Sequence, residues 1–197
     1  MRNFCIFAIC LRVVDLNKLH LFKPSKYDDL DIYFNYINKL DLRIKSKQIL
    51  LNSDIKKLLL YIRKKIGNYY LEKKGSPSII HGDPVFTNVI LFKNTRLKFI
   101  DPRGYTKKKQ TIYGDMFYDY AKIYQSVNGY DFILNNKKID LNYIHDIKRY
   151  FDSKFKIKFG LQQLEYLKYL SCSLVISLQP FHNRSKNKEY IKICDNI

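Results

Sequence analysis

Two short polar segments hold the residues of this chain whose types and spacing could do chemistry. Residues 81–88 read HGDPVFTN, with Asp83 five positions before Asn88. Residues 100–104 read IDPRG, in which Asp101 directly follows an apolar run. A carboxylate can orient a hydroxyl group and take up its proton, and carboxylate and amide oxygens are ligands that Mg²⁺ accepts.

Phosphoryl transfer from a nucleotide requires such a set of groups. A carboxylate must orient the attacking hydroxyl group and accept its proton, while oxygen ligands hold Mg²⁺ against the phosphates. The spacing predicts Asp83 as the base, and Asn88 and Asp101 as the ligands of the metal. Each segment alone could be an ordinary turn, but their occurrence together favours the catalytic interpretation.

A β-hairpin is predicted to position the two segments. Residues 89–92 and 97–100 are short apolar runs typical of strands, and residues 93–96 between them are typical of a hairpin turn. Because Asn88 precedes the first strand and Asp101 follows the second, we expect both at the same open end of the hairpin.

Most of the remaining chain shows apolar residues three or four positions apart, which predicts helices. One helix is expected to begin at Asn52 or Ser53 and to end near Gly67. The other predicted elements are a strand at 79–80 and helices near residues 30–40, 115–128, 141–155, 161–179 and 186–195. The predicted fold class is α+β and mostly helical, a single domain with a helical part at 1–76 and a catalytic part at 77–197.

The composition describes a basic, core-forming chain. Of its residues 46% are hydrophobic, which excludes a disordered chain, and the formal net charge is +18. Such a charge suggests an anionic partner: nucleic acid, a phosphorylated ligand or a membrane surface. The lysines are scattered, however, and heavy use of Lys, Asn, Ile and Tyr is typical of a genome rich in A and T. No specific nucleic-acid partner is therefore predicted.

The cysteines and the apolar start of the chain bear on its compartment. The four cysteines, at positions 5, 10, 172 and 194, form no Cys-x-x-Cys pair and no metal-ligand spacing. We interpret them as buried thiols of a cytoplasmic protein. The apolar run at 1–11 is followed by Arg12 and is too short to span a bilayer, so no transmembrane segment is predicted.

The two polar segments also resemble a known family. His-Gly-Asp-x-x-x-x-Asn, followed after a short hairpin by Ile-Asp-Pro, resembles the catalytic and metal-binding loops of the aminoglycoside phosphotransferase and choline kinase family. That family is similar to protein kinases, whose catalytic loop has the same Asp-to-Asn interval. Residues 114–122, GDMFYDYAK, resemble the family's Asp-Leu-Ala helix with Tyr120 in place of Leu. Asp119 matches the Asp that braces the catalytic loop through backbone hydrogen bonds.

This resemblance implies the C-terminal lobe of a protein-kinase-like fold, with 1–76 as its hinge-side part. The implied activity is ATP-dependent phosphorylation of a hydroxyl group on a small molecule such as an aminoglycoside, choline or a sugar. IDPRG together with residues 126–131 is similar to a bacterial subgroup associated with synthesis of capsule or surface polysaccharide. The site residues it implies are one catalytic base, two ligands of metal and cofactor, and two structural supports: Asp83; Asn88 and Asp101; His81 and Asp119.

Four further residues keep two interpretations each. Arg103 could contact a phosphate or pair with a carboxylate. His182 lies either near the mouth of an acceptor site or on the general surface. His20 and His145 are surface or core residues.

Kinases of this kind also use an N-terminal lobe with a glycine-rich loop and a strand lysine. None of the seven glycines falls in a Gly-x-Gly pattern and only 80 residues precede His81, so we expect that lobe to be absent and the isolated chain to transfer phosphate negligibly. Three interpretations follow: an active enzyme whose other lobe is a separate chain, a truncated fragment, or a catalytically silent binding module. The presence of all the motif residues favours the first, or a recent truncation.

Overall fold

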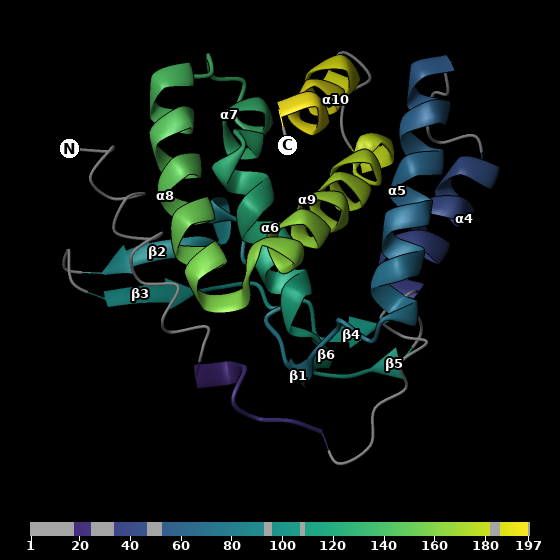
Figure 1. Ribbon diagram of the computed structural model, residues 1–197. Helices are drawn as coiled ribbons and strands as arrows, with labels where there is room; N and C mark the ends of the chain where they lie inside the picture. Colours follow the sequence, from purple (N-terminus) through teal and green to yellow (C-terminus); the bar gives the residue numbers. More distant parts are fainter. Residues whose placement is uncertain are drawn as a thin grey trace.

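The computed structural model describes residues 18–24, 34–46, 53–92, 96–106, 109–181 and 186–196. Within them the chain is mostly helical, with three two-stranded antiparallel strand pairs (Figure 1). The predicted α+β, mostly helical class is confirmed in this form. The finer prediction, one lobe of a kinase-like fold, stays a prediction.

The helix α9 (Leu161–Ile176) lies at the centre of the helical core. It packs against α5 (Ser53–Leu71), α6 (Met116–Val127), α8 (Leu141–Phe159) and α10 (Asn187–Asn196), and Figure 1 shows it crossing between them. Its second half, residues 170–176, is continuously buried, as expected of a helix with neighbours on several sides.

The helix α6 is buried from Phe117 to Val127. Its polar residues recur at helical spacing on one face: Asp115 at the N-cap, then Asp119, Lys122 and Ser126. A polar stripe on a buried helix needs polar partners, because an unpaired buried polar group is costly. The loop at 81–88 supplies them to Asp119, Lys122 and Ser126, whereas the partners of Asp115 come from elsewhere in the fold.

Three predicted helix ends were wrong, and one of them is that of α9, which ends at Ile176 and not near residue 179. The helix α5 does not end near Gly67 but continues past it. A side chain at position 67 would have open space around it, so the packing does not require a glycine there. It ends after Leu71, where Lys73 takes a left-handed conformation (φ 51°) and the amide of Lys74 donates to the carbonyl of Tyr69 at 3.0 Å. The helix α8 runs on to Phe159 and stops at Gly160.

The helix predicted near 30–40 runs beyond its predicted end. Its described part consists of a π-helical turn, η1 (Phe34–Asn38), followed by α4 (Lys39–Lys45). Residues 25–33 lie outside the described residues. A further short helix, α7 (Tyr130–Leu134), was not predicted; it begins after Gly129, whose φ of 97° turns the chain out of α6.

The predicted hairpin is present as β2 (Val89–Phe92) and β3 (Arg96–Phe99), with Val89 opposite Phe99. Residues 93–95 of its turn lie outside the described residues. The strand predicted at 79–80 is β1 (Pro77–Ile79), and its antiparallel partner is β6 (Tyr113–Asp115). A third pair joins β4 (Tyr105–Thr106) to β5 (Lys109–Gln110). The pairing of β1 with β6 and that of β4 with β5 were not predicted.

Cys172 and Cys194 are buried free thiols, as predicted, whereas Cys5 and Cys10 lie outside the described residues. In the described part of the chain, no helix combines the length and the apolar character needed to cross a membrane.

Candidate active site

Asp119 supports the loop at 81–88 from the first turn of α6. Its carboxylate is fully buried and accepts hydrogen bonds from the backbone N–H groups of His81 at 2.9 Å and Gly82 at 2.7 Å. These are the contacts expected of a residue that braces this loop. The ring of His20 contributes a third contact, with Nε2 3.1 Å from Oδ2.

Gly82 is required where the loop turns. Its φ is 83°, a left-handed conformation that side chains disfavour, and a Cβ there would lie 2.7 Å from Cβ of Arg103. The two polar segments also touch at this point, because the N–H of Arg103 donates to the carbonyl of His81 at 2.9 Å. The loop therefore has little freedom to shift against the IDPRG segment.

The C-terminal half of the loop is held by two further side chains. The N–H of Phe86 donates to Oγ of Ser126 at 3.0 Å, and the N–H of Thr87 donates to Asp131 Oδ1 at 3.0 Å. Burial raises the pKa of Asp131, and the hydrogen bonds from Ser126 and Thr87 only partly oppose that shift. Sequence reasoning assigned no role to Ser126 or Asp131.

Asp83 lies between these supports and is itself more open. Its side chain is 35% exposed, and its carboxylate lies 3.0 Å from the ammonium group of Lys122, whose side chain is only 10% exposed. The amide nitrogen of Asn88 donates to the backbone carbonyl of Asp83 at 3.0 Å and lies 3.4 Å from its carboxylate. Lys122 was missed from sequence, although its place three residues after Asp119 puts both on one helix face.

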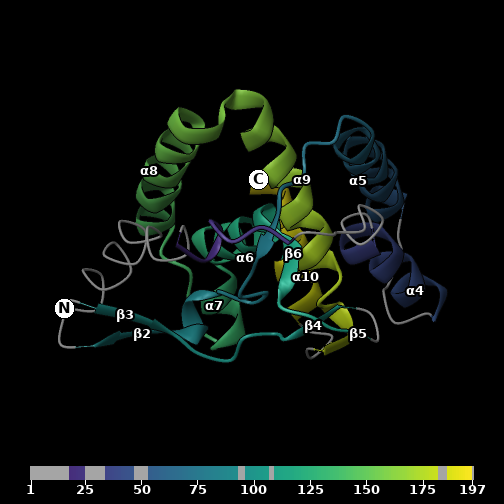
Figure 2. The same ribbon diagram turned by 90° about the horizontal axis from the view of Figure 1, so that it is seen from below.

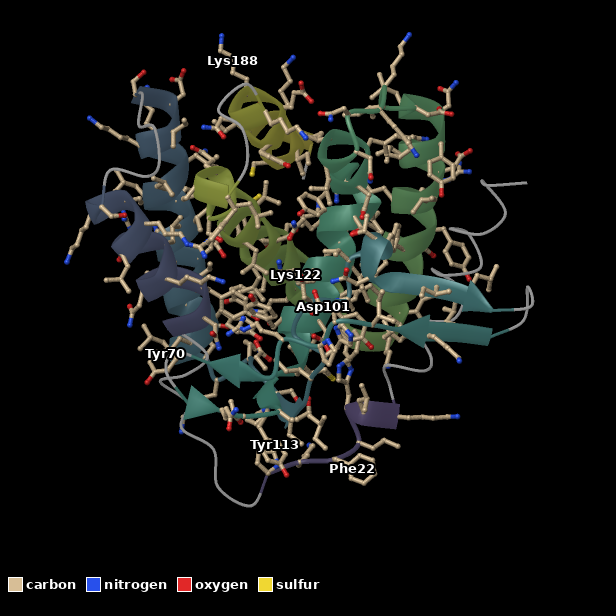
Figure 3. The ribbon with its side chains drawn as sticks, turned by 180° about the vertical axis from the view of Figure 1, so that it is seen from behind. Phe22, Tyr70, Asp101, Tyr113, Lys122 and Lys188 are labelled. Atoms are coloured by element: carbon tan, nitrogen blue, oxygen red, sulfur yellow. The ribbon has the colours of Figure 1, made fainter. Side chains whose placement is uncertain are left out.

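Asn88 and Asp101 lie together at the open end of the hairpin, as expected. The N–H of Ile100 donates to the carbonyl of Asn88 at 3.0 Å, which continues the pairing of Val89 with Phe99. Asp101 is exposed and takes a left-handed conformation, with φ of 59°. Among the described residues, no side chain forms a hydrogen bond or ion pair with its carboxylate. Figure 3 shows Asp101 and Lys122 near the middle of the molecule, between the hairpin and helices α4 and α5.

The side-chain oxygens of Asn88 and Asp101 could serve as two of the ligands of a bound Mg²⁺. Mg²⁺ in enzymes is commonly held by one or two carboxylates and completed by water and substrate phosphates. Asp101 and Asn88 supply one carboxylate and one amide. Among the described residues, no three His, Cys, Asp or Glu side chains lie close enough together to hold a metal ion. Two ligands from the protein would leave the other positions around Mg²⁺ to water and to the phosphates of a substrate.

Two of the histidines, His20 and His81, are buried and in contact with neighbouring side chains. His81 is buried, its ring lies against Phe99 with centroids 5.6 Å apart, and Nδ1 accepts from the N–H of Asp83 at 3.3 Å. Its role as a structural support of the loop stays a prediction. His20 is buried against Asp119, whereas His145 is exposed. His182 lies outside the described residues.

Asp115 fixes the start of α6 and was not predicted to matter. It is buried and accepts four hydrogen bonds: from the hydroxyl groups of Tyr69 at 2.6 Å and Tyr36 at 3.0 Å, and from the N–H groups of Ser76 at 2.9 Å and Phe117 at 3.2 Å. Burial raises its pKa although these hydrogen bonds oppose the shift. Asp115 thereby sets the position of Asp119 one turn later.

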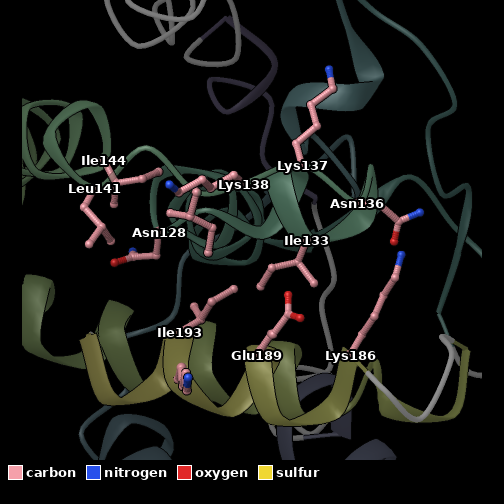
Figure 4. Close-up of a pocket in the computed structure, with 12 residues that line it drawn as sticks. Asn128, Ile133, Asn136, Lys137, Lys138, Leu141, Ile144, Lys186, Glu189 and Ile193 are labelled. Carbon is pink, nitrogen blue, oxygen red and sulfur yellow. The ribbon is translucent and has the colours of Figure 1, made fainter.

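A separate pocket of about 660 Å³ lies between α7, the segment at 136–144 and α10 (Figure 4). Isoleucines form part of its wall, and its charged lining residues are Lys137, Lys138, Lys186, Glu189 and Lys192. Its lining includes none of the residues of the candidate site.

No family model, curated protein or solved structure matches this chain. What the site can do is inferred from its own groups. A half-exposed carboxylate at Asp83 can orient a hydroxyl group and accept its proton. The oxygens of Asn88 and Asp101 at the end of the hairpin can hold a cation, and the loop that carries Asp83 and Asn88 is fixed by buried hydrogen bonds.

Proposed function

We propose that this chain is the catalytic lobe of a phosphotransferase that moves the terminal phosphoryl group of ATP to a hydroxyl group of a small molecule. The observation that carries the proposal is the joint placement of three groups. Asp83 and Asn88 lie on the loop at 81–88 that Asp119 holds by hydrogen bonds, and Asp101 follows Ile100, whose N–H donates to the carbonyl of Asn88 at the same end of the hairpin. Positioning and charge stabilisation provide most of the rate in this chemistry, so a fixed loop is what it requires.

The proposal assigns a role to each residue of the site. Asp83 orients the acceptor hydroxyl group and takes its proton as the oxygen attacks. Lys122, 3.0 Å away, holds the Asp83 carboxylate in place and provides a positive charge beside the transferred group. Asn88 and Asp101 would hold Mg²⁺, which when bound neutralises charge on the phosphates of ATP. His81 and Asp119 keep the loop in shape.

The proposed reaction also requires a part of the enzyme that binds the nucleotide. The strands in the described residues form only two-stranded pairs, and a kinase-like enzyme grips its nucleotide with a larger sheet and its glycine-rich loop. We propose that a further lobe, either on a separate chain or joined to this one, supplies this part. The surface-polysaccharide pathway remains the class of pathway that the sequence resemblance favours.

The experiment is a transfer assay with radiolabelled ATP and Mg²⁺. The acceptor panel contains aminoglycosides, choline, sugars, sugar phosphates and hydroxy amino acids. The chain is assayed alone and with the nucleotide-gripping lobe of a small-molecule kinase fused ahead of residue 1. We expect transfer to one acceptor class in the fusion and little in the chain alone. If no acceptor is phosphorylated in either form, the chain is a binding module and the proposal fails.

A further inference from the structure

The pocket between α7, the segment at 136–144 and α10, here called the α7–α10 pocket, has a lining of two kinds. Figures 1 and 2 show α7 and α10 side by side in two views at right angles. Its apolar wall consists of five aliphatic residues: Ile133, Ile139, Leu141, Ile144 and Ile193. Its charged lining consists of four lysines and one carboxylate: Lys137, Lys138, Lys186, Lys192 and Glu189. Its volume of about 660 Å³ lies within the range of about 300–1,000 Å³ that is usual for small-molecule sites.

Asn128 places an unused hydrogen-bond acceptor in the lining of this pocket. The residue is only 3% exposed. Its Nδ2 donates to the carbonyl of Tyr124 at 2.8 Å, which fixes the end of the amide that carries the oxygen. That oxygen, Oδ1, is buried and forms no hydrogen bond with any described residue. Because a buried carbonyl oxygen without a donor is costly, this position calls for a donor that the described chain does not supply.

Glu189 of α10 adds a second acceptor. It lies in the first turn of the helix, and Ile193 follows one turn later on the same face. Figure 4 shows both side chains pointing from α10 toward Ile133 of α7. Within the described residues, no hydrogen bond or ion pair occupies the carboxylate of Glu189. Since an ionised carboxylate only accepts hydrogen bonds, Glu189 and Asn128 together fit a ligand whose hydroxyl groups donate.

The lysines give the pocket an excess of positive charge. Figure 4 shows Lys137 pointing away from α10, which leaves three lysines against one carboxylate. The ammonium group of Lys186 donates to the carbonyl of Leu134 at 3.0 Å, and this contact holds it at the end of α7 with further N–H groups to donate. Lys138 and Lys192 are exposed, and neither forms a hydrogen bond or ion pair within the described part of the chain. A phosphate group has the complementary charge and several acceptor oxygens.

We propose that the α7–α10 pocket binds a sugar phosphate group, with the lysines on the phosphate and with Asn128 and Glu189 accepting hydrogen bonds from the sugar hydroxyl groups. The aliphatic wall covers an apolar face of the bound molecule. A free sugar phosphate and a nucleoside monophosphate both carry this group, and they differ by a base that the aliphatic wall would contact. The pocket shares no lining residue with the candidate active site, so this inference does not rest on the proposed transfer reaction.

Calorimetric titration of the chain with ribose 5-phosphate, in buffer free of phosphate and magnesium, tests for binding. Ribose and inorganic phosphate are the matched probes, because each carries only one part of the group. We expect ribose 5-phosphate to bind about tenfold more tightly than either of them. Tighter binding of AMP than of ribose 5-phosphate would assign the site to a nucleotide, and equal or weaker binding would assign it to a free sugar phosphate. If neither ribose 5-phosphate nor AMP binds, the proposal is overturned.

Two lysine substitutions on α10 locate the binding. Lys192 and Lys188 are both exposed on this helix, but only Lys192 lines the pocket. We expect Lys192→Met to weaken binding of ribose 5-phosphate by about fivefold, because it removes a cation that meets the phosphate. The matched control Lys188→Met should leave the affinity unchanged. Equal affinity in the two variants would place the binding outside this pocket and contradict the proposal.

Glu189→Ala separates hydrogen bonding from simple attraction of anions. If the pocket attracted anions by charge alone, removal of this carboxylate would tighten the binding of every anion. In the proposed site Glu189 accepts from a sugar hydroxyl group, so we expect ribose 5-phosphate to bind about fivefold more weakly to the variant. Inorganic phosphate, which has no sugar, should bind no more weakly than to the wild type. Glu189 is exposed, so the variant should fold, and tighter binding of ribose 5-phosphate would overturn the proposal.

Discussion

Asp119 and Asp83 are carboxylates that serve the same loop in opposite ways. Asp119 is fully buried, and each of its oxygens is occupied by a donor from the loop. Asp83 is partly exposed and has an ion pair with Lys122. A buried acceptor contributes to stability, since its removal leaves donors unpaired, whereas an open carboxylate contributes a reactive group. The same residue type therefore divides into support and chemistry according to its surroundings.

This division predicts different costs of substitution. Asp119→Ala leaves the N–H groups of His81 and Gly82 without their acceptor and should lower the free energy of unfolding by about 1–3 kcal/mol. Asp83→Asn keeps the shape of its side chain and the contact with Asn88, so its cost should be smaller. Urea denaturation of the two variants measures both costs. The reverse order would mean that the roles of these two carboxylates have been exchanged.

At the scale of elements, the site depends on the hydrogen bonds between the loop at 81–88 and the helix α6. The helix α6 directs its polar stripe at the loop, and the loop directs successive backbone N–H groups back at that stripe. The helical period of α6 could be predicted because it is local. The polar stripe was also legible in the sequence at its spacing of three and four residues, but its partners were not. Their contacts span about 40 residues, and for His20 they span 99.

Glycine substitutions test how tightly this loop is held. Gly82→Ala places a side chain in a left-handed conformation and against Arg103, so we expect a loss of about 1–3 kcal/mol in the free energy of unfolding. Gly67→Ala is the matched control, because it lies inside α5 with open space around it. There alanine should stabilise the helix by about 0.5–1 kcal/mol. Thermal melts that rank the two variants the other way would contradict the described loop.

The end of the hairpin carries the prediction about metal. Mn²⁺, used as a probe for Mg²⁺, should bind weakly to the wild type, because substrate phosphates normally complete such a shell. Asp101→Ala should abolish that binding. Asp146→Ala, at an exposed acidic residue of α8, is the control and should leave it unchanged. Calorimetric titration that finds equal binding by the Asp101 variant and the wild type would remove Asp101 from this role.

At the scale of the whole molecule, a core built around α9 holds α6 in place, and the functional groups collect on one side of α6. Composition and periodicity were enough to predict this mostly helical class. The net charge of +18 was too diffuse in sequence to locate a partner. Folding brings Arg103 to 4.9 Å from the ring of Tyr118 and Lys122 to 3.0 Å from the carboxylate of Asp83. Neither these contacts nor the pairing of β1 with β6 leaves a local pattern, so neither could be predicted before the fold was known.

The central claim is that Asp83 acts as the base in phosphoryl transfer. The most direct measurement is the turnover of Asp83→Asn beside its affinity for ATP, both in the form of the protein that transfers phosphate. A base acts in the transition state and not in nucleotide capture. Turnover should therefore fall by about 10²–10⁴-fold while the dissociation constant for ATP stays nearly unchanged. Turnover that survives the substitution, or that falls only in proportion to lost ATP binding, would contradict the claim.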